Sequence, residues 1–185
     1  MGHGGDVVAE LTADHREVDE LFHQFEVAPP GSEARGRLVA ALTIELVRHS
    51  VAEEQYLYPA VRKHLEGGHS LADKELADHA RVEHLLKDLQ HREPTDKDFD
   101  RLMVKLRTEV TAHVDDEENN LFPQMRSNVH AAVLEDLGDK IRQAKKTAPT
   151  RPHPAAPTTP PANKTLAPGL GLVDRVRDYL SGRGQ

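Results

Sequence analysis

Two segments of eleven residues, one starting at His49 and the other at His113, share the pattern H-x-x-x-E-E-x-x-L-[YF]-P. On a helix, residues four positions apart lie on the same face, about one turn apart. His49 and Glu53 therefore point the same way, and so do His113 and Glu117. An imidazole and a carboxylate on one face can bind a metal ion, and the carboxylate can bridge two ions. Two such helices facing each other would form a dinuclear site in a bundle core.

The surrounding residues predict that both pairs are buried. Each pair continues an apolar helical stripe, which comprises Leu42, Leu46, His49, Glu53, Tyr56 and Ala60 in the first copy and Phe99, Leu102, Leu106, Val110, His113, Glu117 and Leu121 in the second. The alternative is a solvated surface pair, but ionisable groups on a core-facing stripe are stable only when paired or metal-bound. Glu54 and Glu118 lie about 100° off the stripe. We interpret them as neighbours of the ligands or as solvated groups, and not as ligands.

The composition restricts the classes of function. The chain has 185 residues without Cys or Trp, which suits one stable domain with an appendage. The absence of Cys excludes disulfides, zinc–thiolate sites and iron–sulfur clusters. With 24 basic and 31 acidic residues the net charge is −7, which argues against nucleic-acid binding. The first residues do not resemble a signal peptide, and no stretch approaches the roughly 20 apolar residues of a membrane span. We therefore expect no membrane association and a cytoplasmic location.

Apolar periodicity and helix-breaking residues predict an all-α fold. The expected helices cover about residues 5–28, 33–66, 70–91, 96–127 and 129–146, with Pro29-Pro30-Gly31, Gly67-Gly68 and Pro94 between them. Pro59 and Pro123 fall inside the second and fourth helices, directly after the repeated His/Glu pairs, and should kink or interrupt them. Residues 1–146 are thus expected to form one helical domain.

Two further histidines lie on apolar stripes. His15 is on the stripe of the first helix and His79 is on that of the third. A lone histidine at such a position can be a core residue with satisfied hydrogen bonds, or a ligand. Glu83 follows His79 by four residues and lies about 40° from it around the helix, so it is a candidate for an additional ligand. His84 points about 140° away and is expected on the flank of the helix.

The composition changes at the C-terminal end. Residues 147–168 are rich in Pro, Thr and Ala and have no core-forming side chains, which predicts a disordered, semi-rigid linker. Residues 169–185 form the tail, in which 170–181 could fold as a short amphipathic helix. A helix of this length is only marginally stable when it is isolated in water. It could dock on the bundle, on a second copy or on a protein partner, and the alternative is a frayed tail.

The order H … HxxxE … H … HxxxE, together with the doubled H-x-x-x-E-E-x-x-L-[YF]-P, resembles the hemerythrin-like, HHE cation-binding domains over about residues 5–127. The resemblance implies an up-down-up-down four-helix bundle, with residues 129–146 as a short fifth helix. It implies two iron ions that share an oxo or hydroxo bridge. It also implies that Glu53 and Glu117 bridge the irons and that the terminal ligands are His15, His49, His79 and His113.

The sequence departs from the respiratory hemerythrins, which have a fifth histidine at the position of Glu83. The corresponding coordination position would be open or filled by Glu83, by Tyr56 or by water. Tyr56 lies seven residues after His49 on the same face, although it could equally be a core aromatic residue. An open or anionic position stabilises ferric iron relative to ferrous iron, which argues against simple reversible O2 storage.

The resemblance then implies a di-iron protein that binds or reacts with O2, NO or H2O2 in sensing, scavenging or the response to oxidative stress. A peroxide-decomposing, catalase-like activity would make it an enzyme, whereas binding alone would not. One alternative is a metal- or gas-responsive interaction module that signals through residues 170–181. Another is iron buffering, although nothing in the sequence suggests the large cage that bulk storage needs.

Overall fold

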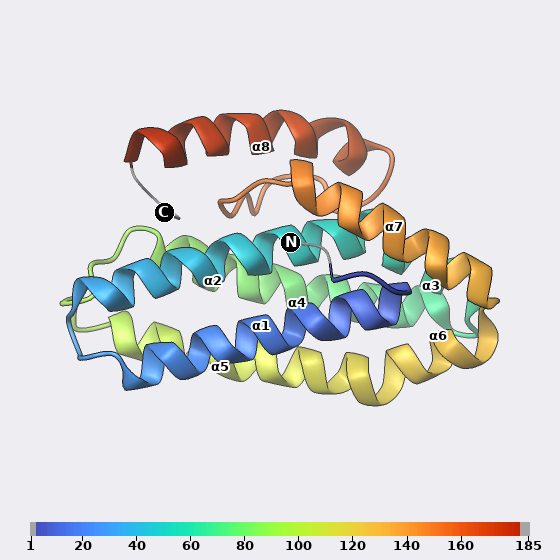
Figure 1. Cartoon of the computed structure of the whole chain (residues 1–185), viewed down its shortest axis with the longest axis horizontal. Helices are drawn as coiled ribbons and strands as arrows, with labels where there is room; N and C mark the ends of the chain where they lie inside the picture. Colours follow the sequence, from blue (N-terminus) through green and yellow to red (C-terminus); the bar gives the residue numbers. More distant parts are fainter. Residues whose placement is uncertain (1–2, 182–185) are drawn as a thin grey trace.

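The computed structural model describes residues 3–181, and these residues are helical without β-strands. The helices are α1 (Val7–Val27), α2 (Glu33–Ala52), α3 (Tyr58–His64), α4 (Gly68–Leu89), α5 (Phe99–Asp116), α6 (Phe122–Asn128), α7 (Ala131–Thr147) and α8 (Ala162–Ser181). Two π-helical turns, η1 (Glu53–Leu57) and η2 (Glu117–Leu121), join α2 to α3 and α5 to α6. The chain runs up, down, up and down through four long rods, with α7 as a fifth helix across one end and α8 on the outside (Figure 1). The predicted all-α four-helix bundle is confirmed.

Local sequence signals set the ends of the helices. The Asp6 side chain caps α1 by accepting a hydrogen bond from the N–H of Ala9 at 2.8 Å, and Ser32 caps α2. Gly67 precedes α4 with φ of 67°, a left-handed conformation that favours glycine. A Cβ on Gly68 would lie 2.2 Å from the backbone oxygen of Val61. The close turn between α3 and α4 therefore requires both glycines.

The interruptions expected at Pro59 and Pro123 take the form of π-helical turns. The N–H of Tyr58 donates to the carbonyl of Glu53, five residues earlier, and the N–H of Phe122 donates to the carbonyl of Glu117 in the same way. Proline has no N–H to continue the α-helical ladder, so the extra residue of each π turn is accommodated just before it. Each long rod is therefore an α–π–α helix, and the π turns begin at the two repeated glutamates.

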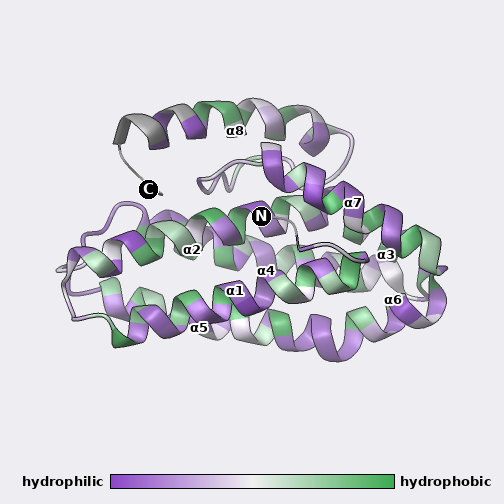
Figure 2. Cartoon of the chain, in the orientation of Figure 1, coloured by the Kyte–Doolittle hydropathy of each residue, from purple (hydrophilic) through white to green (hydrophobic). Residues whose placement is uncertain are grey.

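The core consists of two apolar clusters, one at each end of the bundle. One cluster includes Leu11, Leu57, Val61, Leu121 and Met125, and the other includes Phe22, Leu42, Leu86, Phe99 and Leu106. Along each long rod the stripe passes from one cluster to the other through a histidine. Figure 2 shows apolar residues interspersed with polar ones along the rods. A buried polar layer thus crosses the middle of the bundle.

Helix α7 is anchored to α1 by a buried cation. The Lys145 Nζ donates to Glu10 Oε1 at 3.0 Å and also contacts Asp14, and all three side chains are buried. Burial alone would raise the pKa of Glu10, but the hydrogen bonds from Lys145 and from the N–H of His3 outweigh this effect and lower it. The Lys145–Glu10 pair therefore contributes to the link between the fifth helix and the bundle only while Glu10 is ionised.

Replacing Lys145 with methionine should destabilise the fold by up to about 3–5 kcal/mol, because Glu10 and Asp14 would lose their buried cation, although Glu10 would keep Arg142 at 3.3 Å as a partner. The lowered pKa of Glu10 means that its stabilising contribution is present above its unfolded pKa and is lost as the pH falls through the folded value. The difference between variant and wild type should therefore shrink in acid. Urea unfolding at several pH values measures it. The exposed neighbour provides the control: Lys146→Met should behave as wild type, and equal stability of both variants would contradict the prediction.

The C-terminal segment differs from the predicted linker and tail. Helix α8 begins at Ala162, eight residues before the expected start, and contains Pro168. Asp174 is fully buried and accepts hydrogen bonds from the N–H groups of Thr150 and Arg151 at 3.2 and 3.1 Å, so the Pro-rich stretch packs on α8. The expected apolar face is turned outward at Leu172, which is 60% exposed.

Residues 182–185 of the expected tail lie outside the described residues, as do residues 1–2 of the expected helical domain. Within residues 3–181, no helix combines the length and the hydropathy that crossing a bilayer requires.

Candidate metal centre

The six predicted ligands meet in the polar layer at the middle of the bundle, and none is more than 6% exposed. The closest approaches of the imidazole Nε2 atoms to carboxylate oxygens are His49 to Glu53 at 3.2 Å, His79 to Glu53 at 3.2 Å, His15 to Glu117 at 3.4 Å and His113 to Glu117 at 3.6 Å. Each long rod of the bundle supplies one histidine. The two glutamates come from the start of the π turns.

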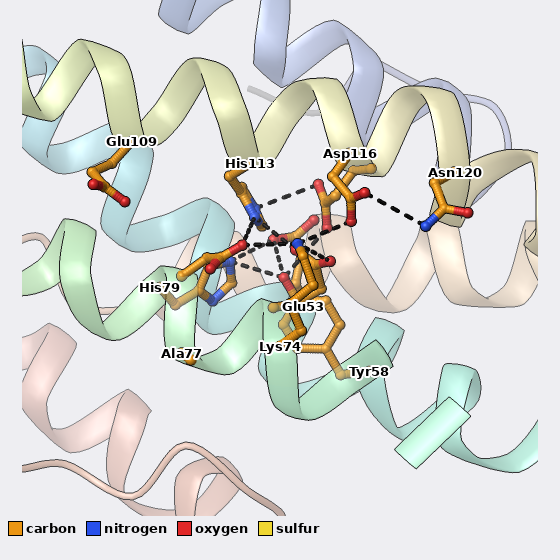
Figure 3. A network of polar contacts seen from close by, with 12 residues as sticks. Glu53, Tyr58, Lys74, Ala77, His79, Glu109, His113, Asp116 and Asn120 are labelled. Carbon is orange, nitrogen blue, oxygen red and sulfur yellow. Dashed lines mark hydrogen bonds and ion pairs between the residues drawn. The ribbon is translucent and has the colours of Figure 1, made fainter. Parts of the chain in front are cut away.

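The ligand atoms form two overlapping groups. His15, His49, Glu53 and Glu117 place one ligand atom each within 4.8 Å of one another, and Glu53, His79 and His113 do the same. Figure 3 shows the second group, which converges from η1, α4 and α5. Glu53 belongs to both groups, as a carboxylate that bridges two metal ions must.

Several of these atoms have no hydrogen-bond partner among the described residues. They are the Nε2 atoms of His15, His49 and His113, Oε1 of Glu53 and Oε2 of Glu117. Buried polar atoms without partners are destabilising, by about 1–3 kcal/mol each. Metal ions between the imidazoles and carboxylates would satisfy these atoms together. The donors are nitrogen and oxygen without thiolate, a set that suits iron or manganese. The residues therefore fit the dinuclear metal site that the sequence predicts.

A carboxylate lies next to the Nδ1 atom of each of the four imidazoles. The pairs are His15 with Glu118 at 2.8 Å, His49 with Asp14 at 3.2 Å, His79 with Glu54 at 3.1 Å and His113 with Glu75 at 2.8 Å. Such partners fix the orientation of each ring and leave Nε2 to face the metal. Glu54 and Glu118 therefore neighbour the predicted ligands, in agreement with their position off the stripe.

Sequence reasoning missed Asp14 and Glu75. Asp14 precedes His15 in the chain, and Glu75 lies one turn before His79 on α4. Each carboxylate nevertheless contacts the histidine of a different helix, because the bundle brings α1 against α2 and α4 against α5. Proximity in sequence to a candidate ligand was the available signal. This signal would have identified both carboxylates. It would have paired Asp14 with His15 and Glu75 with His79, whereas in the structure they contact His49 and His113.

Around Glu53, the protein favours protons on the imidazoles of His49 and His79 rather than on the carboxylate. Burial by itself lowers the pKa of His79, but Glu53 and Glu54 outweigh burial and raise it to about 10. Burial also opposes the charge of Glu53, but His49 and His79 hold the pKa of this carboxyl well below its usual range. A metal ion that binds here displaces protons from the imidazoles, so metal binding is coupled to proton release.

Tyr58 is a further residue of the centre that sequence reasoning did not identify. Its hydroxyl lies 2.9 Å from Nε2 of His79 and 3.3 Å from both Glu53 Oε2 and Glu117 Oε1, and its side chain is 1% exposed. Burial and the surrounding carboxylates raise the pKa of the phenol well above its usual value. Tyr58 reaches the centre because residues five apart share a face in a π turn.

The two candidates for an additional ligand, Tyr56 and Glu83, have other partners in the structure. Tyr56 is only half-buried and has the Lys164 Nζ 4.1 Å from the centre of its ring. The α-helical spacing that placed it with His49 does not hold through η1. Glu83 accepts a hydrogen bond from the backbone N–H of His153 at 2.7 Å and faces the C-terminal segment. Neither side chain lies with the six predicted ligands.

The second copy of the repeat has Phe122 where the first has Tyr58. The Phe122 ring stacks on the His15 ring, with 5.7 Å between centroids and 6° between planes. Beside the four imidazoles lies a cavity of about 20 Å³, whose remaining walls are Ser50 and valine and leucine side chains from α1, α2, α4 and α5. This volume holds about one water-sized molecule. The centre thus has a phenol on one side and a small, mostly apolar space on another.

Replacing Glu75 with glutamine should lower metal affinity by about 10–100-fold, because the carboxylate that orients His113 would be lost. Competition against a chromophoric chelator measures the affinity. Asp73 is an exposed acid on the same helix, so Asp73→Asn is the matched control and should bind metal as wild type does. Equal affinity of both variants would show that the orientation of His113 does not depend on Glu75.

Comparison with known proteins agrees with this geometry. Residues 6–125 match the family described as Hemerythrin HHE cation binding domain. An uncharacterized hemerythrin-like protein of Schizosaccharomyces pombe is 27% identical over 168 residues, which cover 90% of this chain and 82% of that protein. A DNA nickase of Nostoc is 27% identical over 136 residues, which cover 73% of this chain but 38% of the nickase.

A solved structure shares the fold. The crystal structure of a Hemerythrin HHE cation binding domain-containing protein of Mycobacterium kansasii superposes with a TM-score of 0.67 and 26% identity, and the match covers 76% of this chain and 85% of that one. The family match spans more than half of the chain and includes all six predicted ligands. The chain therefore belongs to the hemerythrin HHE cation-binding domain family.

Proposed function

We propose that the protein binds two iron ions at this centre and decomposes hydrogen peroxide there, with O2 and NO as alternative ligands. The observation that carries the proposal is the cavity of about 20 Å³ against the four imidazoles, which holds about one water-sized molecule and therefore limits the ligands of the centre to very small molecules. The hydroxyl of Tyr58 favours peroxide over reversible O2 storage. An oxygen donor beside the site stabilises ferric iron, and a phenol can hold or donate a proton.

The chain supplies the positions and the protons. His15, His49, His79 and His113 would hold the ions through Nε2, with Glu53 and Glu117 between them. Bound iron supplies Lewis acidity and a reversible change of oxidation state. Two molecules of H2O2 give two of water and one of O2, so one peroxide is reduced and the other is oxidised, and no external reductant is needed. Tyr58 is the protonated group closest to this chemistry, and the apolar cavity walls exclude bulk water.

The proposal is tested by loading the protein with ferrous iron under anaerobic conditions. We expect about two irons per chain. After exposure to air, added H2O2 should disappear while an oxygen electrode records half as many moles of O2. A protein that retains iron but consumes no peroxide would refute the peroxide activity, and O2 or NO binding would then be measured. A protein that retains no iron would refute the di-iron centre itself.

A second candidate function is an interaction module that responds to the state of the centre. The observation in its favour is the pair Leu172 and Val173 on α8, which are 60% and 49% exposed. An apolar pair at the surface of a terminal helix can contact a protein partner or a second copy. Sedimentation of the iron-loaded and iron-free protein, each with and without Leu172→Glu, tests self-association. A single sedimentation coefficient for all four samples would contradict self-association.

A further inference from the structure

A second cavity, of about 50 Å³, lies between the bundle and the C-terminal segment. Its walls include Leu46, Ser50, His79 and Val82, and the same four residues line the smaller cavity at the metal centre. The two spaces are therefore separated by a single layer of side chains. One of these side chains, His79, is itself a predicted ligand. The larger cavity is thus the space next to the centre on the side of α2 and α4.

The C-terminal segment forms the outer wall of this larger cavity. Helices α2 and α4 provide the floor, and residues between Pro149 and Leu170 provide the roof. Ala167 of α8 is 7% exposed and faces this space. Without the roof, the apolar floor beside His79 would be an open groove. Access from this side therefore depends on where the segment lies.

A small set of polar contacts holds the roof in place. Asp174 accepts the N–H groups of Thr150 and Arg151 and lies 2.9 Å from Nε2 of His153. The N–H of His153 donates to Glu83 on α4, which ties the segment to the bundle. At the other end, Gln55 Nε2 donates to the carbonyl of Asn163 at 3.4 Å, a long contact. Because few contacts fasten the roof, it can open locally at a smaller free energy than the bundle core.

The charged groups that line the cavity are already engaged with protein partners. Arg151 pairs with Asp178 at 2.7 Å, His153 with Asp174, and Glu54 with His79. An anionic molecule entering this space would lose its hydration without gaining an unpaired cation, because Arg151 and His153 already face carboxylates, which is unfavourable. The volume accommodates a few water-sized molecules. The cavity therefore suits small uncharged molecules and excludes bulky or anionic ones.

We propose that this cavity is the entrance through which small uncharged reactants reach the metal centre, and that residues 148–181 form the lid that excludes larger molecules. The inference rests on the proposed function in taking the centre to hold iron. It does not require peroxide turnover. A ferrous site reacts with dissolved O2 whatever its physiological substrate, so access can be measured independently of peroxide turnover.

The first variant narrows the entrance. Ala167→Leu adds three carbon atoms that point into the cavity, and the control Ala162→Leu places the same side chain at an exposed position of the same helix. The proteins are loaded with ferrous iron and mixed with O2 in a stopped-flow instrument, and oxidation is followed in the near ultraviolet. Ala167→Leu should slow oxidation about tenfold, which corresponds to about 1.4 kcal/mol. Ala162→Leu should oxidise as wild type does.

The second variant displaces the lid. A Cβ on Gly171 would lie 2.2 Å from the backbone oxygen of Thr147 and 2.7 Å from that of Ala148, so Gly171→Ala forces α8 away from the end of α7. Gly169 has no atom within 4 Å of its ideal Cβ position, which makes Gly169→Ala the matched control. The rate at which a bulky sulfonated chelator removes ferrous iron should rise about tenfold in Gly171→Ala only.

The outcomes separate this inference from the proposed function. Oxidation of Ala167→Leu at the wild-type rate, in a protein of unchanged iron content, would overturn the entrance. Chelation of iron from Gly171→Ala at the wild-type rate would contradict the proposal that residues 148–181 form a lid over the entrance. The wild-type protein could fail to decompose peroxide while Ala167→Leu and Gly171→Ala show the expected changes in oxidation and chelation rates. This result would refute the peroxide activity and would still support the entrance and the lid.

Discussion

Alanine at both Glu53 and Glu117 is expected to reduce the metal content of the purified protein from about two ions per chain to almost none. Between them, the two carboxylates place an oxygen within 3.6 Å of the Nε2 atom of each of the four predicted histidine ligands. Without them the imidazoles offer no anionic ligand to a bridged pair of cations. Elemental analysis of protein purified after iron loading gives the metal content per chain.

The chain offers a closely matched control for this double variant. Glu45 and Glu109 precede Glu53 and Glu117 by eight residues each, and they form solvent-accessible pairs with Arg48 at 3.6 Å and with Arg81 at 2.9 Å, in which each side chain is partly exposed. Solvent-accessible pairs contribute about 0–1 kcal/mol. Alanine at both control positions should leave the metal content unchanged. Retention of wild-type metal content by Glu53→Ala/Glu117→Ala would show that the bridge assignment is wrong.

A folded reference is needed because removal of two buried carboxylates also changes the charge of the core. The pair Glu53→Gln/Glu117→Gln keeps the shape of both side chains but removes their negative charge. Circular dichroism then establishes that the bundle is still helical. We expect this protein to be folded and to contain little metal, which separates loss of the ligands from loss of the fold.

Replacing Tyr58 with phenylalanine is expected to leave the metal content unchanged and to slow peroxide decomposition by about 100-fold or more. The variant removes a hydroxyl that lies 2.9 Å from His79 Nε2 and 3.3 Å from an oxygen of each repeated glutamate. A phenylalanine ring already occupies the same position of the second copy, at Phe122, so the substitution should be tolerated by the fold. The measurement is the rate of O2 release per iron.

Tyr56→Phe is the control for the tyrosine prediction. Tyr56 lies two residues before Tyr58, within η1, but the Lys164 Nζ lies over its ring, 4.1 Å from the ring centre. It should decompose peroxide at the wild-type rate. A slow Tyr56→Phe together with a wild-type Tyr58→Phe would reverse the assignment that the structure makes. It would favour Tyr56, which regular α-helical spacing places on the same face as His49.

The bundle and the meeting of the six predicted ligands follow from features that a sequence displays directly. His49 and Glu53 share a face because they are four residues apart, and that face is apolar on either side of them. Proline and glycine mark the ends of the rods. These are local properties of the chain, so the helical elements and the convergence of His/Glu pairs can be predicted without knowledge of distant contacts.

Other features depend on geometry that the periodicity of an α-helix does not contain. Tyr58 enters the centre only because η1 has one extra residue in its turn, and Pro59 signalled an interruption without specifying its kind. Asp14 and Glu75 act on histidines of neighbouring helices, which depends on the packing of those helices. Asp174 binds residues more than twenty positions earlier, so composition alone suggested a disordered linker.

The Phe122 ring gives the two halves of the centre different chemistry. The repeat provides each half with a histidine, two glutamates and an aromatic ring, which by itself would generate a pseudo-symmetric site. One oxygen atom breaks that symmetry: Tyr58 brings a phenol to the His79 side, while Phe122 stacks a hydrocarbon ring on His15. Two chemically identical ions bound here would therefore be inequivalent, with one in the more polar half and the other in the more apolar half. The two copies of the repeat therefore provide chemically different surroundings for the two halves of the centre.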